Sequence, residues 1–349
     1  MGRKKYNFMT LLRVLSMLAI VLYHMVITLY IYGIRQYDSI KFLFENANMH
    51  IAKIGVGLFF ILSGCGLMMS YENRELKLKE YFKKRFLKIL IPFYIVYIIY
   101  VLFLMATGQV LLTNPYDGRE VAPYSFIFTL LGMDTYLSDF GLKTLSMGIG
   151  EWFLGCLIFM YILFPVFRFF MKKNPYITMA ASTVYYVWMI LYYDSFSFIS
   201  QVPMFTNLTI KIYDFILGMF LATVIKKFPG WIWIPGLAVN LFFVFCPVTL
   251  PGIDSYQIPI QCLSVFLIFF GLENVLSKKD NFLSGIEVMS AYSYECFLVH
   301  HIVINQISKV GINTDFGNTK ILLLFLGESV VVILLTVVLK FLVKKVSSR

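Results

Sequence analysis

The sequence predicts an all-α, polytopic membrane protein with about ten transmembrane helices. The first observation is composition: 59% of the 349 residues are hydrophobic and 14% are charged, whereas soluble globular domains average about 25% charged residues. The second is a series of apolar runs long enough to cross a bilayer, about 17–25 residues each. The third is the uneven distribution of lysine and arginine between these runs. We expect residues 1–349 to form a single transmembrane domain.

The apolar runs define the expected helices in chain order. They cover residues 8–32, 51–71, 86–106, 152–171, 176–193, 209–225, 230–249, 257–276, 286–308 and 320–343. A short amphipathic segment, YSFIFTLLGM, lies in the longest loop between them. We expect this segment to lie at the membrane interface.

The distribution of lysine and arginine predicts the orientation of the chain. With a cytoplasmic N terminus, the cytoplasmic segments carry twenty of these residues and the opposite segments carry six. Cytoplasmic loops of membrane proteins carry such an excess, so both termini are expected in the cytoplasm. The net charge of +11 follows mostly from this bias and needs no nucleic-acid partner. Five scattered cysteines match neither a disulfide framework nor a metal site.

The first expected helix carries two residues that are costly in hydrocarbon, Arg13 and His24. Eleven residues make close to three helical turns, so both side chains lie on one face, roughly 16 Å apart along the axis. A buried histidine with a near-neutral pKa suits general-base chemistry, although it also fits a packed, hydrogen-bonded position. Arg13 fits either a functional role or an anchor that reaches the interface.

The second expected helix, GVGLFFILSGCGLMMSY, alternates small residues with phenylalanine and leucine. Small residues let membrane helices pack closely, and this accounts for most of the pattern. Ser63 fits either a hydrogen bond to a neighbouring helix or one to a ligand.

A basic patch, KKRFLK, precedes the third apolar run. Lys84, Arg85 and Lys88 are helical neighbours at spacings of three and four residues, so their charges lie together beside the membrane. Such a patch can bind phosphate groups, signal topology or contact anionic lipids.

Two later helices carry further candidates. Trp152 begins a helix at the outer interface, and Tyr161 lies deeper in the same helix. The ninth helix runs in the same direction as the first, which places His300 at a depth comparable with His24. Because neighbours on a helix point about 100° apart, we expect one of the adjacent histidines, His300 and His301, to face away from any site that the other lines.

Three acids within the apolar runs complete the set. Asp214 has Lys211 one turn away as an expected ion-pair partner, which indicates a structural role. Glu295 and Glu328 lie inside the last two apolar runs, and the sequence suggests no partner for Glu328.

In this order, the motifs resemble the acyltransferase 3 family of integral membrane O-acyltransferases. Leu157 stands where many members carry a glutamate, which places the chain with a "W-F-L…Y…P" subgroup. The residues that carry the resemblance are Arg13 and His24; Gly55 to Gly64; Lys84, Arg85, Lys88 and Pro92; Trp152, Phe153, Leu154, Tyr161 and Pro165; and Ser293, Tyr294, Phe297, Leu298 and His300.

The resemblance implies an enzyme of a bacterial inner membrane that moves an acetyl or other short acyl group from acetyl-CoA to a hydroxyl of a carbohydrate or glycolipid acceptor. It implies His24 and its partner Arg13 as catalytic residues. It implies that the phosphates of acetyl-CoA, a co-substrate, contact Arg13, Lys84, Arg85 and Lys88. We assign Ser63, Trp152, Tyr161 and His300 to substrate binding.

Two questions stay open at the level of sequence. His24 acts either as a general base on the acceptor hydroxyl or as the carrier of a covalent acyl group. An exporter of a polysaccharide or lipid-linked sugar would also have many helices with buried charges. The missing internal repeat counts against this alternative.

Overall fold

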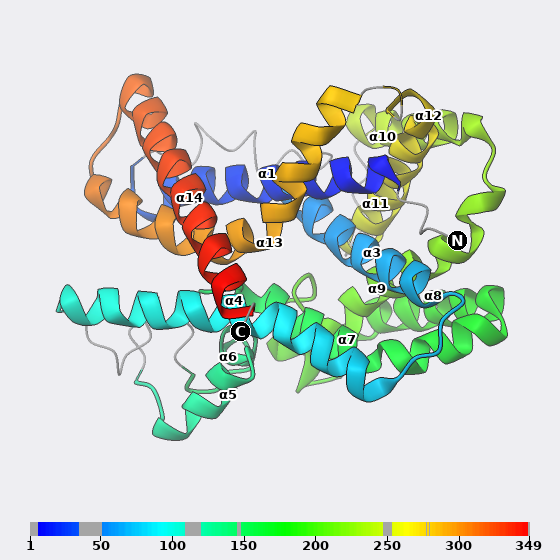
Figure 1. The fold of residues 1–349 in the computed structure, drawn as a ribbon, viewed down its shortest axis with the longest axis horizontal. Coiled ribbons are helices and arrows are strands. Elements are labelled where there is room, and N and C mark those ends of the chain that lie inside the picture. Colours follow the sequence, from blue (N-terminus) through cyan, green and yellow to red (C-terminus); the bar gives the residue numbers. More distant parts are fainter. Residues whose placement is uncertain are drawn as a thin grey trace.

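The computed structural model describes residues 6–34, 51–108, 120–144, 148–246, 253–276, 278 and 280–347. Within these ranges the chain is helical, with no β-strand (Figure 1). Short 3₁₀ turns join several of the helices. The α-helices are α1 (Asn7–Ile31), α3 (Ile51–Tyr71), α4 (Leu78–Ala106), α5 (Phe126–Leu130), α6 (Asp134–Ser138), α7 (Glu151–Lys173), α8 (Pro175–Leu191), α9 (Leu208–Val224), α10 (Trp233–Phe245), α11 (Ile253–Gly271), α12 (Glu273–Leu276), α13 (Asp280–Ser308) and α14 (Asn318–Ser347).

Each expected apolar run corresponds to a helix, but the helices differ in length. In the part of the chain that the structure describes, six helices are long and apolar enough to cross a bilayer: α1, α3, α4, α7, α14, and α9 together with the 3₁₀ turn that continues it to Lys227. The 13 residues of α10 and the 17 of α8 are shorter than that. The chain is therefore an integral membrane protein, while ten spans and the cytoplasmic termini stay predictions.

The expected helix at 257–276 is wrong at its end, because the chain breaks after α11 and forms the short α12. The break places Glu273 at the start of α1. Its carboxylate accepts hydrogen bonds from the backbone N–H groups of Asn7 and Phe8 at 3.0 and 2.8 Å. The first N–H groups of a helix lack partners within it and favour negative charge, so Glu273 caps α1.

Helices α1, α4 and α13 run in one direction. Arg13 of α1 donates to Ser290 of α13 across 277 residues, and the same offset separates His24 from His301. Tyr294 donates to the Ile89 carbonyl of α4, and Gln306 donates to Tyr100 of α4, at offsets of 205 and 206 residues. An offset that stays constant along two helices means that they run parallel. Successive membrane spans alternate in direction, and these helices are the first, third and ninth expected spans, so the sequence predicts the same. Figure 1 shows α1 and α4 extended along the long axis of the molecule.

The closest helix contact joins α3 to α9. A Cβ at Gly64 would lie 2.1 Å from the Phe215 carbonyl oxygen, and one at Gly218 would lie 2.0 Å from that of Ile61. Only glycine permits this approach. The small residues of α3 thus act in helix packing as the sequence predicts, except Gly66, at which a Cβ would meet nothing within 4 Å.

Candidate active site

Three histidines from two helices gather at one place, here called the histidine cluster. The ring of His24 lies 5.2 Å from that of His300 and 4.6 Å from that of His301, measured between centroids. His300 is fully buried, and the other two are half-buried. The predicted common depth of His24 and His300 is confirmed by this contact.

The expectation that one of the two adjacent histidines faces away from a site lined by the other is wrong, because both border the His24 ring. Side chains 100° apart on one helix can still flank a ring that stands between them on a neighbouring helix. His24 occupies such a position on α1, opposite the seam between His300 and His301. Contact across the seam depends on the packing of α1 on α13, which a single-helix argument does not include.

A hydrogen bond fixes the orientation of the His300 ring. Its Nδ1 lies 2.7 Å from the backbone oxygen of Phe297. Because a carbonyl oxygen only accepts, Nδ1 carries the hydrogen, and in the neutral ring Nε2 is the acceptor nitrogen. Phe297 is held in turn by the ring of Phe153 on α7, at 5.0 Å.

The structure also gathers positive charges from three helices, here called the basic cluster: Arg13, Arg85, Lys88 and Lys340. Arg13, Arg85 and Lys340 all lie close enough to Lys88 for their positive charges to repel its ammonium group. The Arg85 guanidinium lies over the ring of Tyr161, 5.8 Å from its centroid. Arg85 is half-buried, whereas Lys84 and Lys88 are exposed.

Lys340 is a member that sequence reasoning missed. It donates to Glu295 at 2.9 Å and to the Ala291 carbonyl at 2.7 Å. The only signal in the sequence was a lysine within an apolar run, which resembles an anchor near a helix end. Its place beside Lys88 comes from the antiparallel packing of α14 on α13.

Two more predicted residues adjoin the basic cluster. Ser63 of α3 and Tyr161 of α7 share a side-chain hydrogen bond, and the charges of Arg85 and Arg13 act on Tyr161. The bond to a neighbouring helix matches the structural alternative for Ser63. It also places both hydroxyl groups beside the cations.

Trp152 lies in a separate aromatic group. Its ring packs against Phe60 at 6.2 Å and Phe205 at 5.6 Å. The ammonium of Lys211 lies over the Phe205 ring, 4.1 Å from its centroid. Lys211 also forms the predicted ion pair with Asp214 at 3.3 Å, and both side chains are buried.

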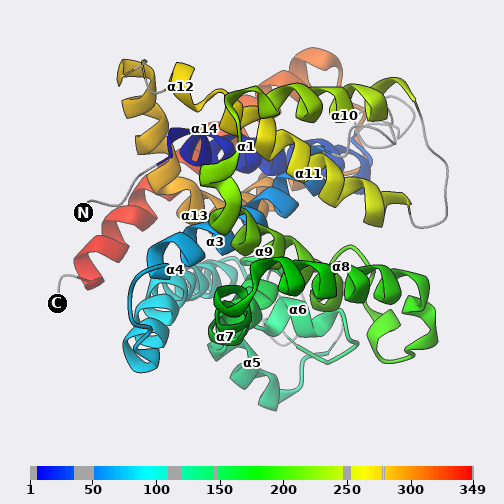
Figure 2. The same ribbon diagram turned by 90° about the vertical axis from the view of Figure 1, so that its right-hand side faces the viewer.

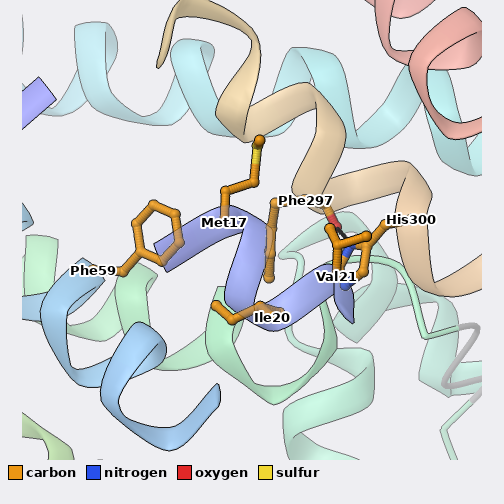
Figure 3. Close-up of a pocket in the computed structure, with 6 residues that line it drawn as sticks. All are labelled: Met17, Ile20, Val21, Phe59, Phe297 and His300. Atoms are coloured by element: carbon orange, nitrogen blue, oxygen red, sulfur yellow. Dashed lines mark hydrogen bonds between the residues drawn. The ribbon is translucent and has the colours of Figure 1, made fainter. Parts of the chain in front are cut away.

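A narrow apolar gap lies beside the histidine cluster. Met17, Ile20 and Val21 line it from the stretch of α1 between Arg13 and His24 (Figure 3). Its remaining lining comes from Phe59, Phe297 and His300. The gap is too narrow for a water molecule, so any ligand that enters must displace side chains.

A family model described as an acyltransferase domain, Acyl_transf_3, matches residues 6–344, nearly the whole chain. The chain belongs to the acyltransferase 3 family. No curated protein and no solved structure matches it. Several of the motif residues meet at two places in this chain: Arg13, Ser63, Arg85, Lys88 and Tyr161 at the basic cluster, and His24 and His300 at the histidine cluster. Trp152 lies apart from both.

Proposed function

We propose that this membrane acyltransferase moves an acetyl or other short acyl group from acyl-CoA to a hydroxyl of a cell-envelope carbohydrate or glycolipid. The observation that carries the proposal is the pairing of the two clusters along α1. Arg13 and His24 lie roughly 16 Å apart, with an apolar gap between them. A donor with an anionic head and a slender thioester arm suits this arrangement.

The basic cluster would bind the donor phosphates. Arginine offers a planar fork that matches phosphate oxygens, and hydrogen bonds between charged groups are the stronger ones. Of the four predicted ligands, Arg13, Arg85 and Lys88 belong to the basic cluster, to which Lys340 adds a fourth cation. Lys84 is exposed and outside this cluster, and we do not include it among the proposed ligands. We place this cluster at the cytoplasmic face, where acetyl-CoA is available.

The thioester arm would follow α1 toward His24. Because the gap is closed to water, side chains that line it must move to admit the arm. Exclusion of water suits the chemistry, since water would otherwise compete with the acceptor for the acyl group.

In the proposed reaction His24 removes the proton of the acceptor hydroxyl as its oxygen attacks the thioester carbonyl. The carbon–sulfur bond breaks, and the CoA thiolate takes up the proton to leave as a thiol. A positioned general base typically contributes about 10²–10⁴-fold in rate. His301 and His300 border the His24 ring and set its orientation.

The test measures transfer of radiolabelled acetyl groups from acetyl-CoA to envelope glycans in membranes that contain wild type, His24→Ala or Leu22→Ala. Leu22 lies two residues away on the exposed face of the same helix. Its alanine variant therefore controls for the loss of a large side chain from α1. We expect label in the glycan with wild type and Leu22→Ala, and a loss of roughly 100-fold or more with His24→Ala.

Thiol release from acetyl-CoA by the purified protein separates the proposal from the exporter alternative. An exporter releases none, with or without acceptor, and that result would overturn the proposed function. Labelled protein that accumulates without acceptor, and is lost in His24→Ala, would instead reject direct attack in favour of an acyl-enzyme.

A further inference from the structure

Residues 124–138, which include α5 and α6 (Figure 2), reverse at many positions the polarity expected of a loop in water. Five large apolar side chains are exposed, at 54–60% of their surface, and four polar side chains are buried, at 7% or less, while Met133 and Tyr136 pack into the core. The exposed residues are Tyr124, Phe126, Ile127, Leu130 and Leu131. The buried polar ones are Ser125, Thr129, Asp134 and Ser138.

The depth of this segment follows from its contacts with α4. Tyr94 of α4 donates a hydrogen bond to the Leu130 carbonyl, and the ring of Tyr97 lies 6.4 Å from that of Phe126. Both tyrosines lie between Ile89 and Tyr100 of α4. These two residues bond to Tyr294 and Gln306 of α13, and the two histidines of α13 lie between those partners. The segment therefore lies at the level of the histidine cluster.

Distances along α4 place this level within the bilayer. Tyr94 is about 14 Å from Arg85 and about 18 Å from the end of the helix at Ala106, at 1.5 Å per residue. The hydrocarbon core of a bilayer is about 30 Å thick. With Arg85 at one surface, Leu130 lies near the middle.

The backbone of the segment meets the requirement for such a depth. Irregular backbone is tolerated in the membrane only where its polar groups are satisfied within the protein. The N–H groups of Leu131, Gly132 and Met133 donate to carbonyls of the segment at 2.8–3.1 Å. Gly132, with φ of +67°, turns the chain toward α7. The Thr144 hydroxyl donates to the Asp134 carbonyl.

We propose that residues 124–138 form a re-entrant element, with its exposed apolar side chains against lipid acyl chains. This replaces the sequence-based expectation of a segment that lies along the membrane interface. The observations are the reversed polarity, the mid-span contacts and the satisfied backbone. The proposal concerns the membrane contact alone and stands independently of the acyl transfer.

The test places a small fluorophore on single cysteines and measures its quenching in liposomes. Cys246 is exposed and the other four native cysteines are buried, so the background is Cys246→Ser in the full chain. The test variants are Ile127→Cys and Leu131→Cys. Leu102→Cys, on the exposed apolar face of α4, marks the lipid, and Lys77→Cys, at the exposed residue that precedes α4, marks water.

We expect probes at 127 and 131 to be quenched by lipids that carry a nitroxide on the acyl chain, as at 102, and to resist aqueous iodide. The probe at 77 should show the opposite pattern. Quenching by iodide at 127 and 131 equal to that at 77 would overturn the proposal. Each labelled protein must elute as a single species with an unchanged helical circular dichroism spectrum. The two test positions are independent, so one well-folded variant suffices.

Discussion

A single added methyl group at Gly64 should separate α3 from α9. In the structure a Cβ at this position would lie 2.1 Å from the Phe215 carbonyl oxygen, and ordinary contact begins at 3.4 Å. The helices must therefore move apart by about 1.3 Å at this point. Overpacking of this kind costs typically about 1–3 kcal/mol.

Gly66→Ala is the matched control, two residues along the same helix. Both substitutions gain the helix propensity of alanine over glycine, about 1 kcal/mol. At Gly66 the new methyl group meets nothing within 4 Å. The difference between the two variants thus isolates the steric cost, and we expect Gly64→Ala to be less stable by about 1–3 kcal/mol.

Unfolding by titration with sodium dodecyl sulfate, followed by circular dichroism, measures this difference in free energy. Gly218→Ala approaches the same contact from α9, 2.0 Å from the Ile61 carbonyl oxygen, and should behave like Gly64→Ala. Equal stability of Gly64→Ala and Gly66→Ala would refute the close packing of the two helices. Because Ser63 adjoins Gly64, activity should fall with stability.

Two further predictions address the ion pair and the basic cluster. Lys211→Met should destabilise the protein by about 3–5 kcal/mol, because it leaves the Asp214 carboxylate buried without its cation. The double variant Lys211→Met with Asp214→Leu should recover most of this stability in the same titration. Failure of the double variant to recover it would contradict the pairing. Arg85→Ala should raise the KM for acetyl-CoA roughly 10- to 100-fold, since a hydrogen bond to a charged group contributes about 1.5–3 kcal/mol. Lys84→Ala, at an exposed neighbour, should change KM little, and equal effects of the two would argue against a specific phosphate contact.

Much of the fold was predictable because it depends on local properties of the chain. A run of about twenty apolar residues must bury its backbone polar groups in hydrogen bonds, and a helix does so within one segment. Alternation of the runs makes α1 and α13 parallel, which is why His24 and His300 could be placed at one depth. The ion pair of Lys211 and Asp214 was predictable because both residues lie on adjacent turns of one helix.

The sequence by itself determined the helices, their relative directions and the residues whose burial is costly. Only the tertiary structure decided which of these residues meet. His301 joins His24 because α1 packs against the seam between two side chains of α13, and Lys340 reaches Lys88 because α14 returns along α13. The reversed polarity of residues 124–138 became visible only against α4. Such contacts join residues tens to hundreds of positions apart, and their geometry depends on how side chains of several helices interlock, which the periodicity of any one helix does not encode.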